Sequence, residues 1–196
     1  MKLDNSFYRN EEVTDVAKNL LGKVLYADIN DVVCAGRIVE TEAYSFREKA
    51  CHAYGNRFTA RTETLFAEGG TAYVYLCYGI HRLFNIVTNQ EGVAEAVLIR
   101  ALEPIQGINH MRGRRNKSSL TALTSGPGKL AQAMGIDLEH DKISLTGPDI
   151  WLENDNFSLS EPEIISGPRI GVDYAGDDAL LFSEFTQSIK LTRSHG

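Results

Sequence analysis

The sequence is poor in cysteine, and its cysteines and histidines lack the spacing of a structural metal site. Cys34, Cys51 and Cys77 form an odd, sparse set without a CxxC pair, which indicates free thiols in a reducing compartment. None of the five histidines belongs to an HxxxH or CxxC…HxxxH pattern of the kind that binds zinc. We therefore expect no disulfide framework, no metal ion and no other cofactor.

Long apolar segments are also absent. No run approaches the ~20 residues that cross a bilayer, and the first residues, MKLDNSFYRNEE, contain no apolar signal core. Internal repeats and low-complexity tracts are missing as well. These absences predict a cytoplasmic protein without a membrane partner. The length of 196 residues and the hydrophobic content of 43% predict one packed domain over residues 1–196.

A net positive charge is lacking too. The chain has 20 Lys and Arg against 26 Asp and Glu, a net charge of −6, which by itself argues against nucleic acid because phosphate binding needs local positive charge. The distribution is uneven, however. Residues 36–130 carry 12 basic and 8 acidic side chains, whereas residues 131–196 carry 4 basic and 12 acidic ones. One face could therefore suit a polyanion, and we expect the acidic segments 137–163 and 173–184 to lie away from it.

Most of the secondary structure that the sequence predicts is β-strand. Expected strands cover residues 23–29, 32–44, 71–78, 82–88 and 93–102, with shorter ones at 150–153, 169–172, 180–182 and 188–191. A helix is expected from Asn10 to the residue before Gly22, another over about 128–134, a short turn at 62–66, and a short helix followed by a basic loop within 104–117. This pattern predicts an α+β fold, a single compact domain around a curved, mostly antiparallel sheet with peripheral helices.

Charged residues in two of the expected strands are candidates for chemistry. Alternation places Ile38, Glu40, Glu42 and Tyr44 on one face of the strand at 32–44. Arg100 is the only charge within VLIRAL, and an arginine in such a run usually pairs with a carboxylate. Surface glutamates and a structural salt bridge would explain the pattern. So would a Glu–Arg pair in a pocket, where the arginine keeps the glutamate ionised and helps to hold a water.

Aromatic residues give a second, weaker pattern. Tyr73, Tyr75 and Tyr78 follow one another in the strand at 71–78, where tyrosines commonly only pack. If they converge on a ligand, they could stack on a nucleobase. Tyr78 and Gly79 at a hairpin tip could also wedge into a duplex.

Two basic segments could contact phosphates. The cluster at Arg112, Arg114, Arg115 and Lys117 would ordinarily be a solvated loop. The segment SGPGKL offers backbone N–H groups and Lys129 at a helix start, which suits an anion. Its spacing is not that of a P-loop.

Six segments follow one another along the chain: GRIVETEAY, CHAYGNRFTARTETLF, AYVYLCYGIHRLFNIV, VLIRALEP, SGPGKLAQAMGI and RIGV. In their sequences and their order they resemble the alkyladenine, or 3-methyladenine, DNA glycosylase family, and the match extends from about residue 7 to 192. The stretch TARTETLF resembles bacterial members of the family. The resemblance implies an α+β domain that flips a damaged purine out of double-stranded DNA and hydrolyses its N-glycosidic bond without a metal.

The resemblance assigns three residues to the water that attacks the sugar. Glu42, the second glutamate of VETEAY, resembles the general base. Arg100 resembles the residue that hydrogen-bonds the water beside it, and the main-chain carbonyl of Ile170 matches the third contact to that water. Glu40 has no role of its own in this assignment.

Other residues would bind the substrate. Tyr44, His52 and Tyr75 match the aromatic walls around the flipped base, with a main-chain N–H of His52 at its edge. Asn85 matches the side chain that crowds out the exocyclic amine of guanine, and Tyr78 the wedge that replaces the extruded nucleotide. Expected contacts to the DNA backbone are Arg57, Arg61, Arg112, Arg115 and Lys129.

These residue types fit the implied chemistry. Cleavage at C1′ builds an oxocarbenium-like sugar that a nearby carboxylate stabilises, and aromatic walls favour a cationic alkylated purine. The set contains no obvious lysine for a Schiff base, so we expect a monofunctional enzyme, acting as a monomer in the bacterial cytoplasm, that leaves an abasic site. Two alternatives stay open: a nucleoside or RNA N-ribohydrolase, and a non-enzymatic nucleic-acid-binding module of similar fold.

Overall fold

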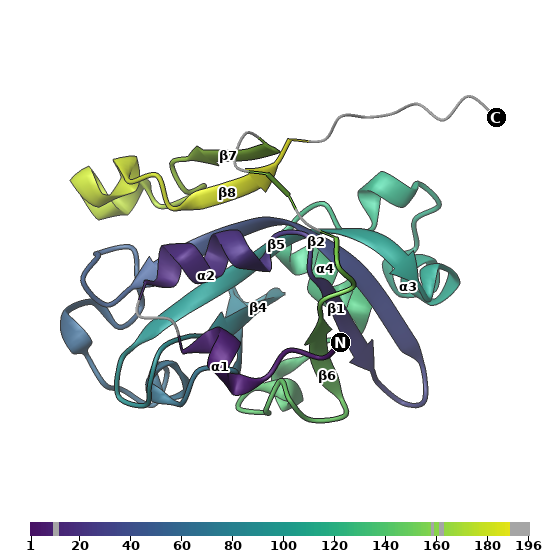
Figure 1. The fold of residues 1–196 in the computed structure, drawn as a ribbon, viewed down its shortest axis with the longest axis horizontal. Helices are drawn as coiled ribbons and strands as arrows, with labels where there is room; N and C mark the ends of the chain where they lie inside the picture. The colour runs from purple at the N-terminus through teal and green to yellow at the C-terminus, as the bar shows by residue number, and fades with distance from the viewer. Residues whose placement is uncertain (10–11, 158, 161–162, 189–196) are drawn as a thin grey trace.

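The computed structural model describes residues 1–9, 12–157, 159–160 and 163–188. Its eight strands form one sheet in which β3, β4, β5, β2, β1 and β6 are neighbours in that order, while β8 pairs with β2 and β7 pairs with β8 (Figure 1). All of these pairings are antiparallel. The strands are β1 Val24–Asp28, β2 Val33–Ser45, β3 Ala72–Cys77, β4 His81–Val87, β5 Glu95–Gln106, β6 Ile150–Glu153, β7 Ile164–Gly167 and β8 Glu184–Gln187. The predicted α+β class is confirmed.

The long strand β2 organises the sheet. One of its edges pairs with β5 over almost its whole length. The other edge pairs first with β1 and then, at residues 40–42, with β8. Figure 1 shows β8 and β7 together at the top of the molecule, beyond β2 and α2. A segment from the end of the chain is thereby placed beside the glutamates of β2.

Short helices cover the sheet. The α-helices are α1 Asn5–Tyr8, α2 Val13–Leu20, α3 Ile108–Arg115 and α4 Pro127–Met134, and short 3-10 helices include η1 Tyr54–Asn56, η2 Glu63–Phe66, η3 Leu120–Ala122 and η4 Leu138–His140. Proline at the first position of α4 and left-handed Gly135 after its end match the sequence pattern. Asn10, the expected start of the first long helix, lies outside the described residues. None of the described helices has the length and hydropathy needed to cross a membrane.

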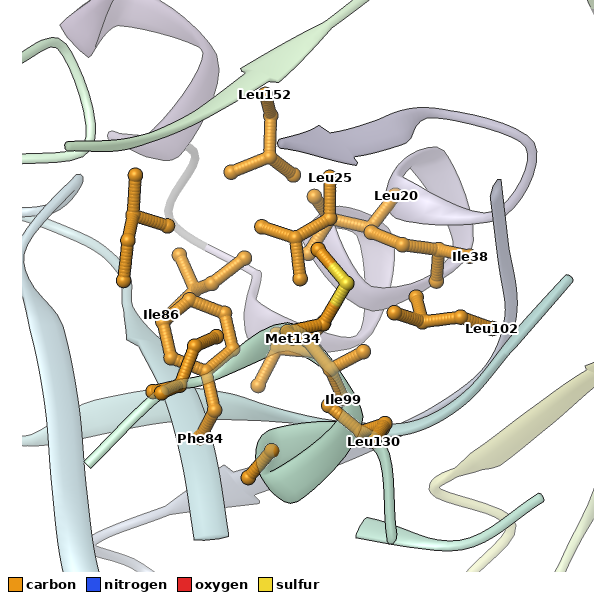
Figure 2. Close-up of a cluster of buried hydrophobic side chains, with 14 of the residues drawn as sticks. Leu20, Leu25, Ile38, Phe84, Ile86, Ile99, Leu102, Leu130, Met134 and Leu152 are labelled. Carbon is orange, nitrogen blue, oxygen red and sulfur yellow. The ribbon is translucent and has the colours of Figure 1, made fainter. Parts of the chain in front are cut away.

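One apolar cluster joins the helices to the sheet. Buried side chains from α2 and α4 meet those of the strands (Figure 2), among them Leu20, Leu25, Ile38, Phe84, Ile86, Ile99, Leu102, Leu130, Met134 and Leu152. On α2 the inward positions have helical spacing, with Val13, Val16, Ala17 and Leu20 all buried. Burial of these side chains stabilises the sheet that carries the polar residues described below.

The alternation expected for β2 is wrong at Ile38. The register between β2 and β5 shifts on both sides of Glu40, which marks bulges. Ile38 therefore belongs to the apolar core, whereas Glu40 and Glu42 contact Arg100. A bulge adds a residue to one strand and reverses the alternation beyond it, so the two glutamates lie on the face opposite Ile38.

The expected short elements are partly wrong. No strand forms at 169–172, and residues 173–180 form a 3-10 helix, η6 Asp173–Leu180, that covers the start of the strand expected at 180–182. The strand at 150–153 is confirmed as β6, and most of the one expected at 188–191 lies outside the described residues. The segment at 169–172 contacts β2 through side chains instead of a backbone ladder, which local patterns do not reveal. The expectation of a basic loop is also wrong for three of its residues, because Arg112, Arg114 and Arg115 lie within α3.

Candidate active site

The site is built around the carboxylate of Glu42, whose side chain is 0% exposed. Its Oε1 atom accepts a hydrogen bond from the main-chain N–H of Ile170 at 2.8 Å and lies 3.1 Å from Nη1 of Arg100. Its Oε2 atom accepts from the hydroxyl of Tyr44 at 2.7 Å. A buried carboxylate needs such partners, and these three hold its orientation. The predicted Glu42–Arg100 pair is confirmed as a contact.

Arg100 contacts both glutamates of β2. Its Nε donates to Oε1 of Glu40 at 2.7 Å, while Nη1 faces Glu42. The arginine side chain is 13% exposed. Arg100 lies at the irregular part of the β2–β5 ladder, where bulges redirect side chains. Glu40 therefore orients Arg100, a role that the sequence did not indicate.

Arg169 fastens the C-terminal segment to the site. Its fully buried guanidinium donates to the carbonyl of Ala43 at 2.8 Å and to that of Asp178 at 2.9 Å, and it pairs with Glu48. The same group lies 5.0 Å from the ring centre of Tyr44. These contacts place the neighbouring Ile170 on Glu42. The structure thus brings Ile170 to the predicted site, through its N–H group.

A narrow cleft of about 60 Å³ opens beside Tyr44, the residue whose hydroxyl donates to Glu42. Its lining is mainly aromatic and small: Tyr44, Ala50, Cys51, His52, Leu65, Tyr73, Tyr75, Asn85, Ala96 and Tyr174. The predicted wall residues Tyr44, His52 and Tyr75 are among them. His52 meets Tyr75 edge-on, with ring centres 4.7 Å apart, and its Nδ1 lies 3.0 Å from the hydroxyl of Tyr73. Such a cleft suits a flat aromatic ligand.

His52 is neutral at physiological pH. Burial, followed by the nearby charge of Arg61, lowers its pKa to about 4. A neutral imidazole does not repel a positively charged ring, so the cleft is compatible with a cationic base. The Nδ2 atom of Asn85 donates to the carbonyl of Tyr73 at 3.2 Å, which fixes this buried amide at the cleft wall.

Tyr78 lies at the tip of the β3–β4 hairpin. The side chain is 90% exposed. Its φ of 50° and that of Gly79, 72°, together with the hydrogen bond from Ile80 N–H to the carbonyl of Cys77, form a type I′ turn. Positive φ is costly for a large side chain. A strained, exposed tyrosine is consistent with a side chain that contacts another molecule.

The cleft continues into a cavity of about 860 Å³ whose lining includes Glu42, Arg100 and Tyr78. Tyr44, His52, Tyr75 and Tyr174 line both spaces. Two of the expected phosphate contacts, Arg61 and Lys129, line the cavity, and Lys129 holds its ammonium 3.3 Å from the carbonyl of Ser125. The cavity thus joins a buried acid, an exposed tyrosine and two cations.

Comparison with known proteins agrees with this geometry. The family model for methylpurine-DNA glycosylase matches residues 6–187. The chain belongs to the methylpurine-DNA glycosylase family. A relative from Francisella tularensis subsp. tularensis is 47% identical over 165 residues, which cover 83% of this chain and 85% of its own. Relatives from Clostridium perfringens and Clostridium acetobutylicum are each 44% identical, over 89% of this chain and 90% and 88% of their own. All three carry the name "Putative 3-methyladenine DNA glycosylase".

Three expected phosphate contacts of this glycosylase lie outside the cavity lining. Arg57 is exposed just after η1. Arg112 lines a separate groove and donates to the carbonyl of Ser118 at 3.2 Å, and Arg115 donates to the side chain of Gln132. Their contact with DNA stays a prediction.

Sequence patterns missed two residues of the glycosylase site. Tyr174 lines both the cleft and the cavity and donates from its hydroxyl to the carbonyl of Ala50 at 3.2 Å. Glu184 lies directly opposite Glu42 in the β2–β8 ladder. Among the described residues, no acidic side chain of the segments 137–163 and 173–184 lines the cavity that contains Tyr78, as expected, although Glu184 lies beside Glu42 in the sheet. Neither position has a local signal, because pairing between distant strands creates the proximity.

Proposed function

We propose that the Glu42–Arg100 site hydrolyses the N-glycosidic bond of an alkylated purine in DNA and leaves an abasic site, the first step of base excision repair. The observation that carries this proposal is a fully buried, hydrogen-bonded carboxylate in the lining of the larger cavity, which shares Tyr44, His52, Tyr75 and Tyr174 with the aromatic cleft. A base in the cleft would place its sugar beside Glu42.

Glu42 has two roles in this proposal. It accepts a proton from the attacking water, and its negative charge stabilises the oxocarbenium-like sugar that forms as the bond to the base breaks. Arg100 and the segment around Ile170 hold that carboxylate and the water in place. The proton leaves the water, its oxygen bonds to C1′, and the bonding electrons depart with the purine.

The cleft would select the base by charge and shape. Alkylation at N3 or N7 gives the purine a positive charge, and the faces of Tyr44 and Tyr75 attract a cation. Asn85 at the cleft wall would crowd the exocyclic amine of an undamaged guanine. A damaged base also costs less to unstack, which adds selectivity during flipping.

Tyr78 and the cations of the cavity would bind the duplex. The exposed Tyr78 ring would fill the space of the flipped nucleotide, while Arg61 and Lys129 neutralise phosphates. Among the described residues no lysine lines the narrow cleft, and Lys129 is held on Ser125. These features favour hydrolysis without strand cleavage.

The test is incubation of the protein with methylated duplex DNA, followed by mass analysis of the released bases. We expect release of 3-methyladenine and an intact strand with an abasic site. Preference for free methylated nucleosides would instead favour an N-ribohydrolase. Binding of abasic DNA without base release would favour a non-enzymatic module, against which the buried Glu42–Arg100 pair argues.

A further inference from the structure

Three glutamates converge on one arginine at this site. Glu40 and Glu42 come from β2, and both contact Arg100. Glu184 comes from β8, where it is the direct partner of Glu42 in the antiparallel ladder. Directly opposed residues have their side chains on the same face, with Cβ atoms about 5 Å apart. The third carboxyl group therefore lies on the side of the sheet that carries Arg100.

The charges of this cluster do not balance. Among the residues that the structure describes, Arg100 is the cation that acts on Glu184, while Arg169 is engaged by Glu48. The side chains of Arg100 and Glu40 are only 13% and 23% exposed, so water screens their charges little. Like charges directly opposed in a ladder destabilise it, and carboxylates that share a site do not all ionise together.

The proton that relieves this repulsion is bound by Glu184 and Glu40 and not by Glu42. Both oxygens of Glu42 already accept contacts from donors: Ile170 N–H and Arg100 at one, the Tyr44 hydroxyl at the other. Glu40 and Glu184 lie diagonally across the ladder, where long side chains can reach one another, and a hydrogen bond between them contributes to the raised pKa of Glu184. Such a bond between two carboxyl groups requires one proton.

We propose that Glu184 is a positioning residue of this site: it shares one proton with Glu40, and the pair holds Arg100 against Glu42. The inference rests on the proposed function, since it concerns the same carboxylate. Burial, followed by the charge of Glu42, raises the pKa of Glu184 to about 7, which agrees with the geometry. Within the described part of the chain, the charged groups that face Glu184 are Glu42, Arg100 and Glu40.

The state of this proton decides whether the pair can hold Arg100. When Glu184 is protonated, its hydroxyl donates to Glu40, and the cluster of three glutamates and one arginine has a net charge of −1. When the proton leaves, the charge becomes −2, the shared hydrogen bond is lost, and the two carboxylates repel each other. The rate of base release therefore falls as pH increases through about 7, because Arg100 is no longer held against Glu42.

The rate experiment measures single-turnover release of 3-methyladenine from methylated duplex DNA at saturating enzyme, between about pH 5 and about pH 9. We expect the wild type to lose about threefold to tenfold in rate across a step centred near pH 7. Glu184→Gln, which is neutral at every pH, should lack the step and keep the low-pH rate. Glu139→Gln, which removes an exposed carboxylate elsewhere, should retain it. A Glu184→Gln profile identical to that of the wild type overturns the proposal.

A second measurement needs neither activity nor a variant. Carbon-13 NMR of glutamate-labelled wild-type protein, without DNA, should show one side-chain carboxyl that titrates near pH 7. Its absence overturns the proposal even if Glu184→Gln fails to fold. Its presence in a protein that releases no base would support the shared proton while refuting the proposed function, so the two failures are distinguishable.

Discussion

The main-chain N–H of Ile170 donates to Oε1 of Glu42 over 2.8 Å, across 128 positions of sequence. The contact ties an irregular C-terminal segment to the central strand at the point where the chemistry is expected. It also explains why the expected strand at 169–172 does not form, since at Ile170 the backbone donor is used on a side-chain carboxylate.

The first prediction concerns Glu42. Glu42→Gln keeps the size of the side chain but removes the base and the negative charge, so base release should fall by at least about 10³-fold. Binding of methylated duplex should survive, because the cleft, Tyr78 and the cations are unchanged. Single-turnover release and fluorescence anisotropy measure the two effects. Release at the wild-type rate would contradict the mechanism.

The second prediction concerns Arg169. Arg169→Ala removes a fully buried guanidinium and leaves the carbonyls of Ala43 and Asp178 without their donor. The free energy of unfolding should fall by about 3 kcal/mol. Arg9→Ala is the matched control, since its pair with Glu68 is half-exposed, and it should cost less than about 1 kcal/mol. Urea denaturation of both variants checks this. Equal losses would show that the buried contacts do not hold the segment.

The third prediction separates stability from function at Tyr78. Asparagine adopts left-handed backbone more readily than tyrosine, so Tyr78→Asn should raise the free energy of unfolding by about 0.5 kcal/mol. The same change removes the exposed ring and should slow base release from duplex DNA by about tenfold or more. Release from a methylated single strand should change little, because no duplex has to be opened. A uniform loss on both substrates would argue against a wedge.

The fourth prediction follows from the low pKa of His52. The folded state holds this pKa at about 4, below the ordinary value of 6.5, so between these values the unfolded state binds the proton more tightly. The contribution of neutral His52 to the free energy of unfolding is present above pH 6.5 and is lost as pH falls toward 4. Thermal unfolding of the wild type should show this loss, up to about 3 kcal/mol. His52→Gln should show a shallower decline, and an unchanged slope would contradict the assignment.

Much of the fold followed from local patterns. The strands around Asn30–Asp31 and Gly79, and the helix stop at Gly135, depend on turn chemistry and periodicity within a few residues, and the structure confirms them. The pair formed by Glu42 and Arg100 was also predictable, because an arginine in an apolar strand needs a carboxylate partner. The irregular segment at 169–172 was not, because distant side chains hold it.

The sequence by itself determined the family, the strand-rich fold and the pairing of a β2 glutamate with Arg100, because each rests on motifs or periodicity written within single segments. Only the tertiary structure decided which face Ile38 takes, that Glu40 orients Arg100, and that Glu184 joins the cluster. Those outcomes depend on bulges in the β2–β5 ladder and on β8 pairing with β2. Register between strands far apart in sequence is set by packing of the whole sheet, and no single segment encodes it.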